Sequence, residues 1–99
     1  MSPKERRYLQ LRAFLKSSDI KDLEVNKEFV IIKKFKDCRG VLEREVKFIA
    51  DFFYFDKVKN VFVIEAVKTN FSKTAIAYKI QRKLIKQLYP NYHFIETIC

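Results

Sequence analysis

Apolar residues recur along the chain with two periods, one typical of helices and one typical of strands. In residues 4–17, Tyr8, Leu11 and Leu15 follow one another at spacings of three and four, and Leu9 and Phe14 widen this stripe, which predicts an amphipathic helix. Residues 73–89 show a four-residue spacing and predict a second helix. Its expected buried stripe consists of Ile76, Ile80, Leu84 and Leu88.

Four other segments are rich in β-branched and aromatic residues and predict strands. They cover residues 23–35, 44–55, 61–68 and 92–98. A turn at 36–43 contains the only glycine, and a short polar connection joins the second and third segments as a hairpin. The resulting order, α-β-β-β-α-β, predicts a single α/β domain over residues 1–99, in which helices flank a mixed central sheet.

Side chains alternate between the two faces of a regular strand, so the sequence predicts which residues of the hairpin point together. In residues 61–68, Ala66 and Lys68 are expected on one face and Glu65 on the other. In residues 44–55, one face is expected to hold Val46, Phe48, Ala50, Phe52 and Tyr54, and the other Lys47, Ile49, Asp51, Phe53 and Phe55.

Two acids interrupt these apolar strands, and each is costly to bury without a partner. Asp51 lies among aromatic and aliphatic residues, and Glu65 lies within VIEAVK. One interpretation is an ion pair with a nearby Lys or Arg. The other is a cation site, in which carboxylate oxygens bind Mg²⁺ or Mn²⁺ and Lys68 stabilises a phosphate as a point charge.

Charge is the main indication of a partner. Twenty-one Lys and Arg against 12 Asp and Glu give the chain a formal net charge of +9, which attracts polyanions such as nucleic acids. The candidate phosphate-contacting residues on the two helices are Arg6, Arg7, Arg12, Lys73, Lys79, Arg82, Lys83 and Lys86. A weaker candidate zone, for which a solvated loop is the simpler interpretation, consists of Lys33, Lys34, Lys36 and Arg39.

The sequence favours an intracellular protein. No apolar run approaches the roughly 18 residues of a membrane span, and the first ten residues lack the apolar stretch of a signal peptide. Cys38 and Cys99 are too few for a disulfide scaffold and are expected to be reduced thiols.

Several motifs then resemble one known group of enzymes. The segments FIADFFYF (48–55) and VFVIEAVKT (61–69) resemble the paired strands of the PD-(D/E)xK nuclease superfamily. More closely, the chain is similar to a small phage-encoded family of endonucleases related to junction resolvases, whose second strand ends in Glu-Asp-Val-Lys. The opening SPKERRY (2–8) is similar to the family's first-helix motif, Ser-x-x-Glu-x-x-Arg/Tyr, and KLIKQLYPNYHF (83–94) to its closing helix and strand.

This resemblance implies a restriction-endonuclease-like core and metal-dependent hydrolysis of DNA, with Mg²⁺ or Mn²⁺ as the cofactor. By the same resemblance Asp51 is the main metal ligand, Glu5 completes the metal shell and Lys68 is the catalytic lysine. It further implies that the substrate is branched DNA such as a Holliday junction. The resemblance also implies that the protein is a homodimer located in the cytoplasm of a bacterial host.

The chain departs from the family pattern at position 66, where an alanine replaces the motif acid. Three interpretations remain open: the acid was replaced deliberately to trap an uncleaved complex, the chain is a natural relative that binds without cutting, or Glu65 serves as a migrated ligand. Losing one of two central ligands usually abolishes metal-dependent hydrolysis. Two other functions therefore remain as alternatives, a non-catalytic nucleic-acid-binding module of the same fold and a phage inhibitor that binds an acidic host protein.

Overall fold

The helices and strands follow the predicted order. A computed structural model of the chain describes residues 1–68 and 75–98. The two helices are α1 (Pro3–Lys16) and α3 (Ile76–Leu88). The strands are β1 (Ile20–Ile32), β2 (Phe35–Lys36), β3 (Leu42–Glu43), β4 (Val46–Asp56), β5 (Val61–Lys68) and β6 (His93–Ile98). Each predicted helix and strand is confirmed, and the short β2–β3 hairpin is an addition within the predicted turn.

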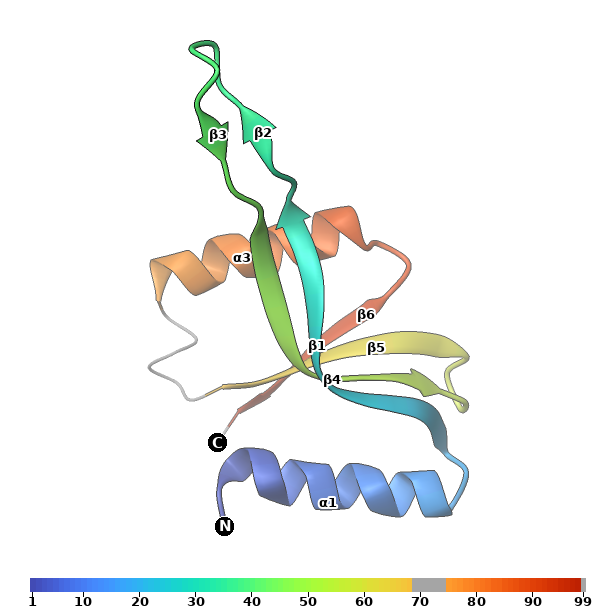
Figure 1. Cartoon of the computed structure of the whole chain (residues 1–99). Coiled ribbons are helices and arrows are strands. Elements are labelled where there is room, and N and C mark those ends of the chain that lie inside the picture. The colour runs from blue at the N-terminus through green and yellow to red at the C-terminus, as the bar shows by residue number, and fades with distance from the viewer. Residues whose placement is uncertain (69–74, 99) are drawn as a thin grey trace.

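Four strands form one sheet in the order β1-β4-β5-β6. β1 and β4 pair antiparallel, as do β4 and β5, whereas β5 and β6 are parallel. The sheet is therefore mixed, with α1 on one face and α3 on the other (Figure 1). This arrangement confirms the predicted α/β class with a mixed central sheet flanked by helices.

The start of α1 is fixed locally by its first residues. The Ser2 hydroxyl accepts the backbone N–H of Glu5 at 3.1 Å, and Pro3 occupies the first helical position. The hydroxyl pairs one of the backbone N–H groups that a helix start leaves unpaired, and proline has no N–H to leave unpaired. Both features are local and need no tertiary contact. Among the helices of residues 1–68 and 75–98, none is long and apolar enough to cross a membrane.

The sheet separates two hydrophobic cores. The α1-side core consists of Leu11, Ile20, Phe52, Tyr54 and Val63, with Tyr8 and Leu15 packed against it. The α3-side core consists of Phe29, Ile31, Phe48, Ala50, Phe53, Ile64, Ala66, Tyr78 and Ile85. The central stripe predicted for α1 is therefore confirmed, whereas Leu9 and Phe14, predicted to widen it, are 53% and 40% exposed. The division of β5 between its two faces is also confirmed.

The alternation predicted for β4 is wrong, because the strand changes face at Asp51. Phe48 and Ala50 lie in the α3-side core, and regular alternation would place Phe52 there as well. Phe52 lies instead in the α1-side core, and Phe53 takes its place beside α3. The side-chain period of two residues thus slips by one at the aspartate.

A backbone irregularity on the neighbouring strand accompanies this change of face. Asn26 has a φ of +56° and lies between the cross-strand pairs Val25–Phe52 and Lys27–Ala50. A positive φ is unusual for a residue with a side chain and marks a local distortion of the strand. β1 and β4 therefore bend together, leaving the sheet as a two-strand ribbon that passes α3 (Figure 1).

α3 packs on the sheet with a face that includes one residue of the predicted stripe, Leu84, which lies against the α3-side core. The buried residues of α3 are Tyr78 and Ile85. Ile76, Ile80 and Leu88 of the predicted stripe are 77%, 54% and 47% exposed. Because α3 has apolar residues on more than one face, their spacing alone does not decide which face is buried. The contacts of Tyr78 and Ile85 with the sheet decide it.

Candidate active site

Asp51 is held at the bend of β4 by contacts from two other elements. Its Oδ2 accepts the backbone N–H of Val67 on β5 at 2.7 Å. Its Oδ1 lies 3.2 Å from Nζ of Lys4 on α1, and the same ammonium donates to Oδ1 of Asn26. The Asp51 side chain is 19% exposed, so its carboxylate is positioned by the fold yet reachable from solvent.

A second group of charged residues surrounds Tyr78 on the α3 side of the sheet. The Tyr78 hydroxyl donates to Glu96 Oε2 at 2.9 Å, and Nη1 of Arg82 donates to Glu96 Oε1 at 3.0 Å. Nζ of Lys68 lies 5.1 Å from the centroid of the Tyr78 ring, within the range of a cation–π contact. We call Asp51, Lys68, Tyr78, Arg82 and Glu96 the Tyr78 cluster.

The pKa of Tyr78 depends on the charge of Asp51, which is why Asp51 is counted in this cluster. Burial raises the pKa of Tyr78 well above its usual value, and the hydrogen bond to Glu96 and the negative charge of Glu96 raise it further. Arg82 lowers this pKa, whereas the charge of Asp51 raises it. Asp51 is therefore within electrostatic reach of the phenol. At neutral pH the Tyr78 hydroxyl keeps its proton and acts only as a donor to the carboxylate.

Two acids lie beside the alanine at position 66. In the parallel pair β5–β6, Ala66 is the partner of Glu96. In the antiparallel pair β4–β5, the register ends at Phe52–Glu65, and Asp51 is the next residue of β4. The Asp51 carboxylate accepts the backbone N–H of Val67, the residue after Ala66, so both acids lie beside position 66. Ala66 itself is fully buried in the α3-side core and provides no ligand.

Glu96 and Tyr78 are two site residues that the sequence does not predict. Glu96 is the only acid in the last strand, and its proximity to position 66 follows only once β6 is paired parallel to β5. A parallel β-α-β connection from β5 through α3 to β6 is the signal that would have found it.

Glu65 lies on the opposite face of β5, in a buried polar network. Its carboxylate is fully buried and accepts Nε and Nη2 of Arg7 at 2.6 and 3.0 Å. It also accepts the hydroxyl groups of Tyr54 at 2.8 Å and Thr97 at 2.9 Å. The hydrogen bond to Glu65 raises the pKa of Arg7, and burial followed by the charge of Glu65 raises that of Tyr54. Glu65 therefore joins α1 to the sheet and is not brought together with Asp51.

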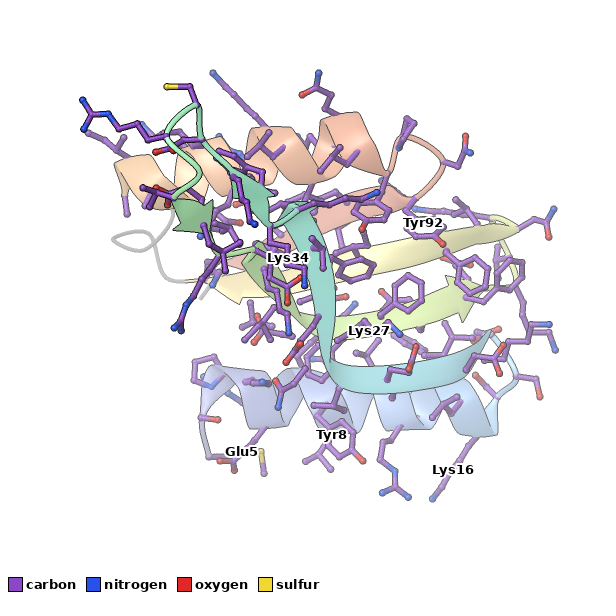
Figure 2. The ribbon with its side chains drawn as sticks, turned by 45° about the horizontal axis from the view of Figure 1, so that its top comes forward. Glu5, Tyr8, Lys16, Lys27, Lys34 and Tyr92 are labelled. Atoms are coloured by element: carbon purple, nitrogen blue, oxygen red, sulfur yellow. The ribbon has the colours of Figure 1, made fainter. Side chains whose placement is uncertain are left out.

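Glu5 is exposed on α1, near the start of the helix and pointing away from the sheet (Figure 2). It lines a groove of about 420 Å³ together with Lys4, the partner of Asp51. Among residues 1–68 and 75–98, no group of three or more His, Cys, Asp or Glu side chains is arranged to hold a metal ion. The predicted trio Glu5, Asp51 and Glu65 is thus not assembled as such.

The predicted phosphate-contacting residues fall into three groups. Arg7 and Arg82 are engaged in ion pairs, with Glu65 and Glu96 respectively. Lys73 lies outside the residues that the structure describes. The candidates with exposed side chains are Arg6, Arg12, Lys79, Lys83 and Lys86.

The raised pKa of Tyr78 gives a testable pH dependence. The folded hydroxyl keeps its proton at a pH where an unfolded tyrosine, with a pKa of about 10, has lost it. Its contribution to the free energy of unfolding is therefore complete below about pH 10 and falls above it, by up to about 1.4 kcal/mol per pH unit. At pH 8 we expect Tyr78→Phe to be less stable than the native chain by about 1 kcal/mol, because the bond to Glu96 is lost.

Urea denaturation of both proteins between pH 8 and pH 11 measures this effect. The stability difference between them should shrink as the pH rises. A difference that stays constant over this range would contradict the assignment of a tightly held phenolic proton.

Comparison with known proteins gives one family and no further relative. The sequence profile of a family described as "Protein of unknown function (DUF1064)" matches residues 2–98. This match spans every helix and strand given above. No curated protein and no solved structure matches the chain.

Proposed function

The chain belongs to the DUF1064 family of proteins of unknown function, and from its charged residues we propose that it is a metal-dependent endonuclease acting on branched DNA. One observation supports this most: two acids lie beside position 66, Glu96 as the cross-strand partner of Ala66 and Asp51 through its hydrogen bond with the backbone N–H of Val67. Lys68, two residues beyond Ala66 on the same face, belongs to the same Tyr78 cluster. The net charge of +9 favours a polyanionic substrate.

The donor set fits a hard divalent cation. Mg²⁺ prefers oxygen ligands and is commonly held by one or two carboxylates together with water and substrate phosphates. Asp51 and Glu96 would supply the carboxylates, since both lie beside position 66. A bound cation would polarise a phosphoryl oxygen and lower the pKa of the attacking water.

The remaining residues of the Tyr78 cluster hold charges in place. The Lys68 ammonium is positioned against the Tyr78 ring, where it can stabilise negative charge on a phosphoryl group. Tyr78 and Arg82 both donate to Glu96 and so fix the orientation of its carboxylate. They are positioning residues in this proposal.

Lys4 places an ammonium group beside Asp51 before any substrate arrives. Its Nζ contacts Asp51 Oδ1, so a divalent cation competes with it for this oxygen. The Lys4 side chain is 38% exposed and is able to turn toward solvent. Glu5 lines the same groove as Lys4, and in this proposal it is not a direct ligand of the metal.

A nuclease assay on a four-way DNA junction tests the proposal. We expect slow cleavage in Mn²⁺, lowered by about 10²-fold or more in Asp51→Asn and in Lys68→Met. Junction binding should persist in both variants, because neither residue is among the exposed helix cations. Glu28→Gln is the matched control, since Glu28 is an exposed acid paired with Lys47.

Equal cleavage by the native chain and Asp51→Asn would refute the assignment of this site.

A homodimer would bring two such clusters to one branched substrate. Light scattering measures the mass of the protein–junction complex and so gives the number of protomers.

The alanine at position 66 favours a second candidate, a non-catalytic nucleic-acid-binding module of the same fold. Ala66 is fully buried and provides no ligand where the endonuclease family that the sequence resembles has an acid. A module of this kind binds the junction tightly and leaves it uncut in Mn²⁺. Its affinity for the junction is unchanged by Asp51→Asn.

A further inference from the structure

The segment between β1 and β4 forms an arm that projects past α3 (Figure 1). We define the arm as residues 33–45, which include β2 and β3. Two cross-strand pairs, Phe35–Glu43 and Lys36–Leu42, hold it together. Every residue from 32 to 47 is exposed.

The tip of the arm is a well-defined turn. The backbone N–H of Asp37 donates to the Val41 carbonyl at 3.0 Å, and the N–H of Gly40 donates to the Asp37 carbonyl at 2.9 Å. Asp37 Oδ1 accepts the N–H groups of Arg39 and Val41 at 2.8 and 3.0 Å. Gly40 has a φ of +81°, which a glycine adopts without strain. The turn therefore presents a fixed apex, formed by Cys38 and Arg39.

The base of the arm is anchored in the α3-side core. The ribbon continues into the cross-strand pair Phe29–Phe48, and both residues are buried in that core. The Tyr89 hydroxyl, just beyond α3, donates to the Val30 carbonyl at 3.2 Å. The arm is thus a continuation of a ribbon that is fixed where it leaves the body, with Lys34 at its root (Figure 2).

The arm carries an excess of positive charge. Its basic residues are Lys33, Lys34, Lys36, Arg39 and Arg44, and its acids are Asp37, Glu43 and Glu45. Asp37 is occupied by the backbone of the turn, and Glu45 lies 3.5 Å from Lys47. Most of the negative charge is therefore engaged within the protein, whereas the basic side chains are exposed.

We propose that the arm enters the major groove of a DNA duplex. The proposal rests on the proposed function, since it names a contact surface for the same substrate. The major groove of B-DNA, about 12 Å wide, admits a two-stranded β-ribbon. The basic side chains then contact the phosphates on both sides of the groove, and these contacts position the protein.

Exposed apolar residues on the arm have a role in this arrangement. Phe35, Val41 and Leu42 are 51%, 52% and 56% exposed. In a groove they contact base edges, including thymine methyl groups. A second copy of the chain is the rival occupant for these residues. The excess of basic residues opposes that pairing, because two arms side by side repel one another, whereas DNA complements the charge.

The cysteine at the apex allows a direct test. In Cys99→Ser, Cys38 is the remaining thiol and is exposed, so a benzophenone maleimide attaches there. Irradiation with a four-way junction should give a protein–DNA adduct. The matched control, Cys38→Ser/Cys99→Ser/Lys59→Cys, carries the reagent on the exposed β4–β5 turn and should give little adduct.

The possible outcomes distinguish a failure of the arm proposal from a failure of the proposed function. DNA binding without an adduct at position 38, or a protein–protein adduct in its place, would overturn the arm proposal and leave the nuclease proposal standing. Absence of DNA binding by the native chain would overturn both.

Charge neutralisation provides a second readout. We expect Lys33→Gln/Lys34→Gln/Lys36→Gln/Arg39→Gln to weaken junction binding and to reduce the slope of log affinity against log salt by about 3. The control removes the same charge from the other end of the ribbon and from α1, as Lys16→Gln/Lys21→Gln/Lys57→Gln/Lys59→Gln. An equal loss of slope in both variants would contradict a specific role for the arm.

Discussion

Replacing Arg7 with Met should lower the free energy of unfolding by about 3–5 kcal/mol, because it leaves a buried carboxylate without its cation. Glu65 is fully buried, and Arg7 holds it through two N–H groups at 2.6 and 3.0 Å. The remaining donors, the hydroxyl groups of Tyr54 and Thr97, are neutral and do not offset the charge. Urea denaturation followed by circular dichroism measures the loss.

Arg12→Met is the matched control for this experiment. Arg12 lies on the same helix and is exposed, with its guanidinium 5.8 Å from the Tyr8 ring centroid. Its replacement should cost no more than about 1 kcal/mol. The double variant Arg7→Met/Glu65→Gln should recover more than half of the loss, because the buried group is then uncharged. Equal losses for Arg7→Met and Arg12→Met would show that Glu65 does not hold α1 to the sheet.

Replacing Ala66 with Asp should destabilise the metal-free protein by about 3 kcal/mol, or roughly 12–24 °C in melting temperature. Ala66 is fully buried, with Glu96 as its strand partner and the Asp51 carboxylate bonded to the next residue, so a third carboxylate there is both desolvated and repelled. Mn²⁺ should reverse most of this loss, since a metal present at a hundredfold excess over its Kd stabilises by about 2.7 kcal/mol. In Mg²⁺ or Mn²⁺ we also expect this variant to cleave branched DNA faster than the native chain.

Ala66→Asn separates the charge from the size of the new side chain. The amide occupies nearly the same volume and is also buried, but it adds no negative charge. We expect it to lose stability without recovering it in Mn²⁺. Thermal unfolding of both variants, with and without the metal, gives the comparison. Equal rescue of the two, or rescue of neither, would argue against a cation site at this position.

The sequence predicts the elements of this fold well, because each has a local signal. β5 is predicted at residues 61–68 and observed at Val61–Lys68, since a run of β-branched residues ends there in a polar segment. The helix start at Ser2 and Pro3 is also a local property. What the sequence does not predict depends on contacts between segments distant along the chain.

Two errors illustrate this limit. Simple alternation along β4 assumes a regular strand, whereas the strand bends at Asp51 together with Asn26 on β1, far away in sequence. On α3, Ile76 and Ile80 have the right spacing for a buried stripe, but the packing of the helix on the sheet buries another face.

The residues of the candidate site also divide into those with a local signal in the sequence and those that depend on contacts between distant segments. Asp51 and Lys68 stand out in sequence, the first as an acid among aromatic residues and the second by its spacing from position 66. Glu65 stands out equally, yet its network with Arg7 shows that an acid in a core strand often reflects a buried ion pair. Glu96 becomes a candidate only through the parallel pairing of β5 and β6.

A crystal soaked in Mn²⁺ tests most directly whether this protein holds a divalent cation against DNA. We expect an anomalous difference peak within about 2.5 Å of an Asp51 carboxylate oxygen, on the side that Lys68 and Glu96 share, with the Lys4 ammonium displaced. An Asp51 carboxylate still paired with Lys4, with no peak beside it at saturating Mn²⁺, would contradict it.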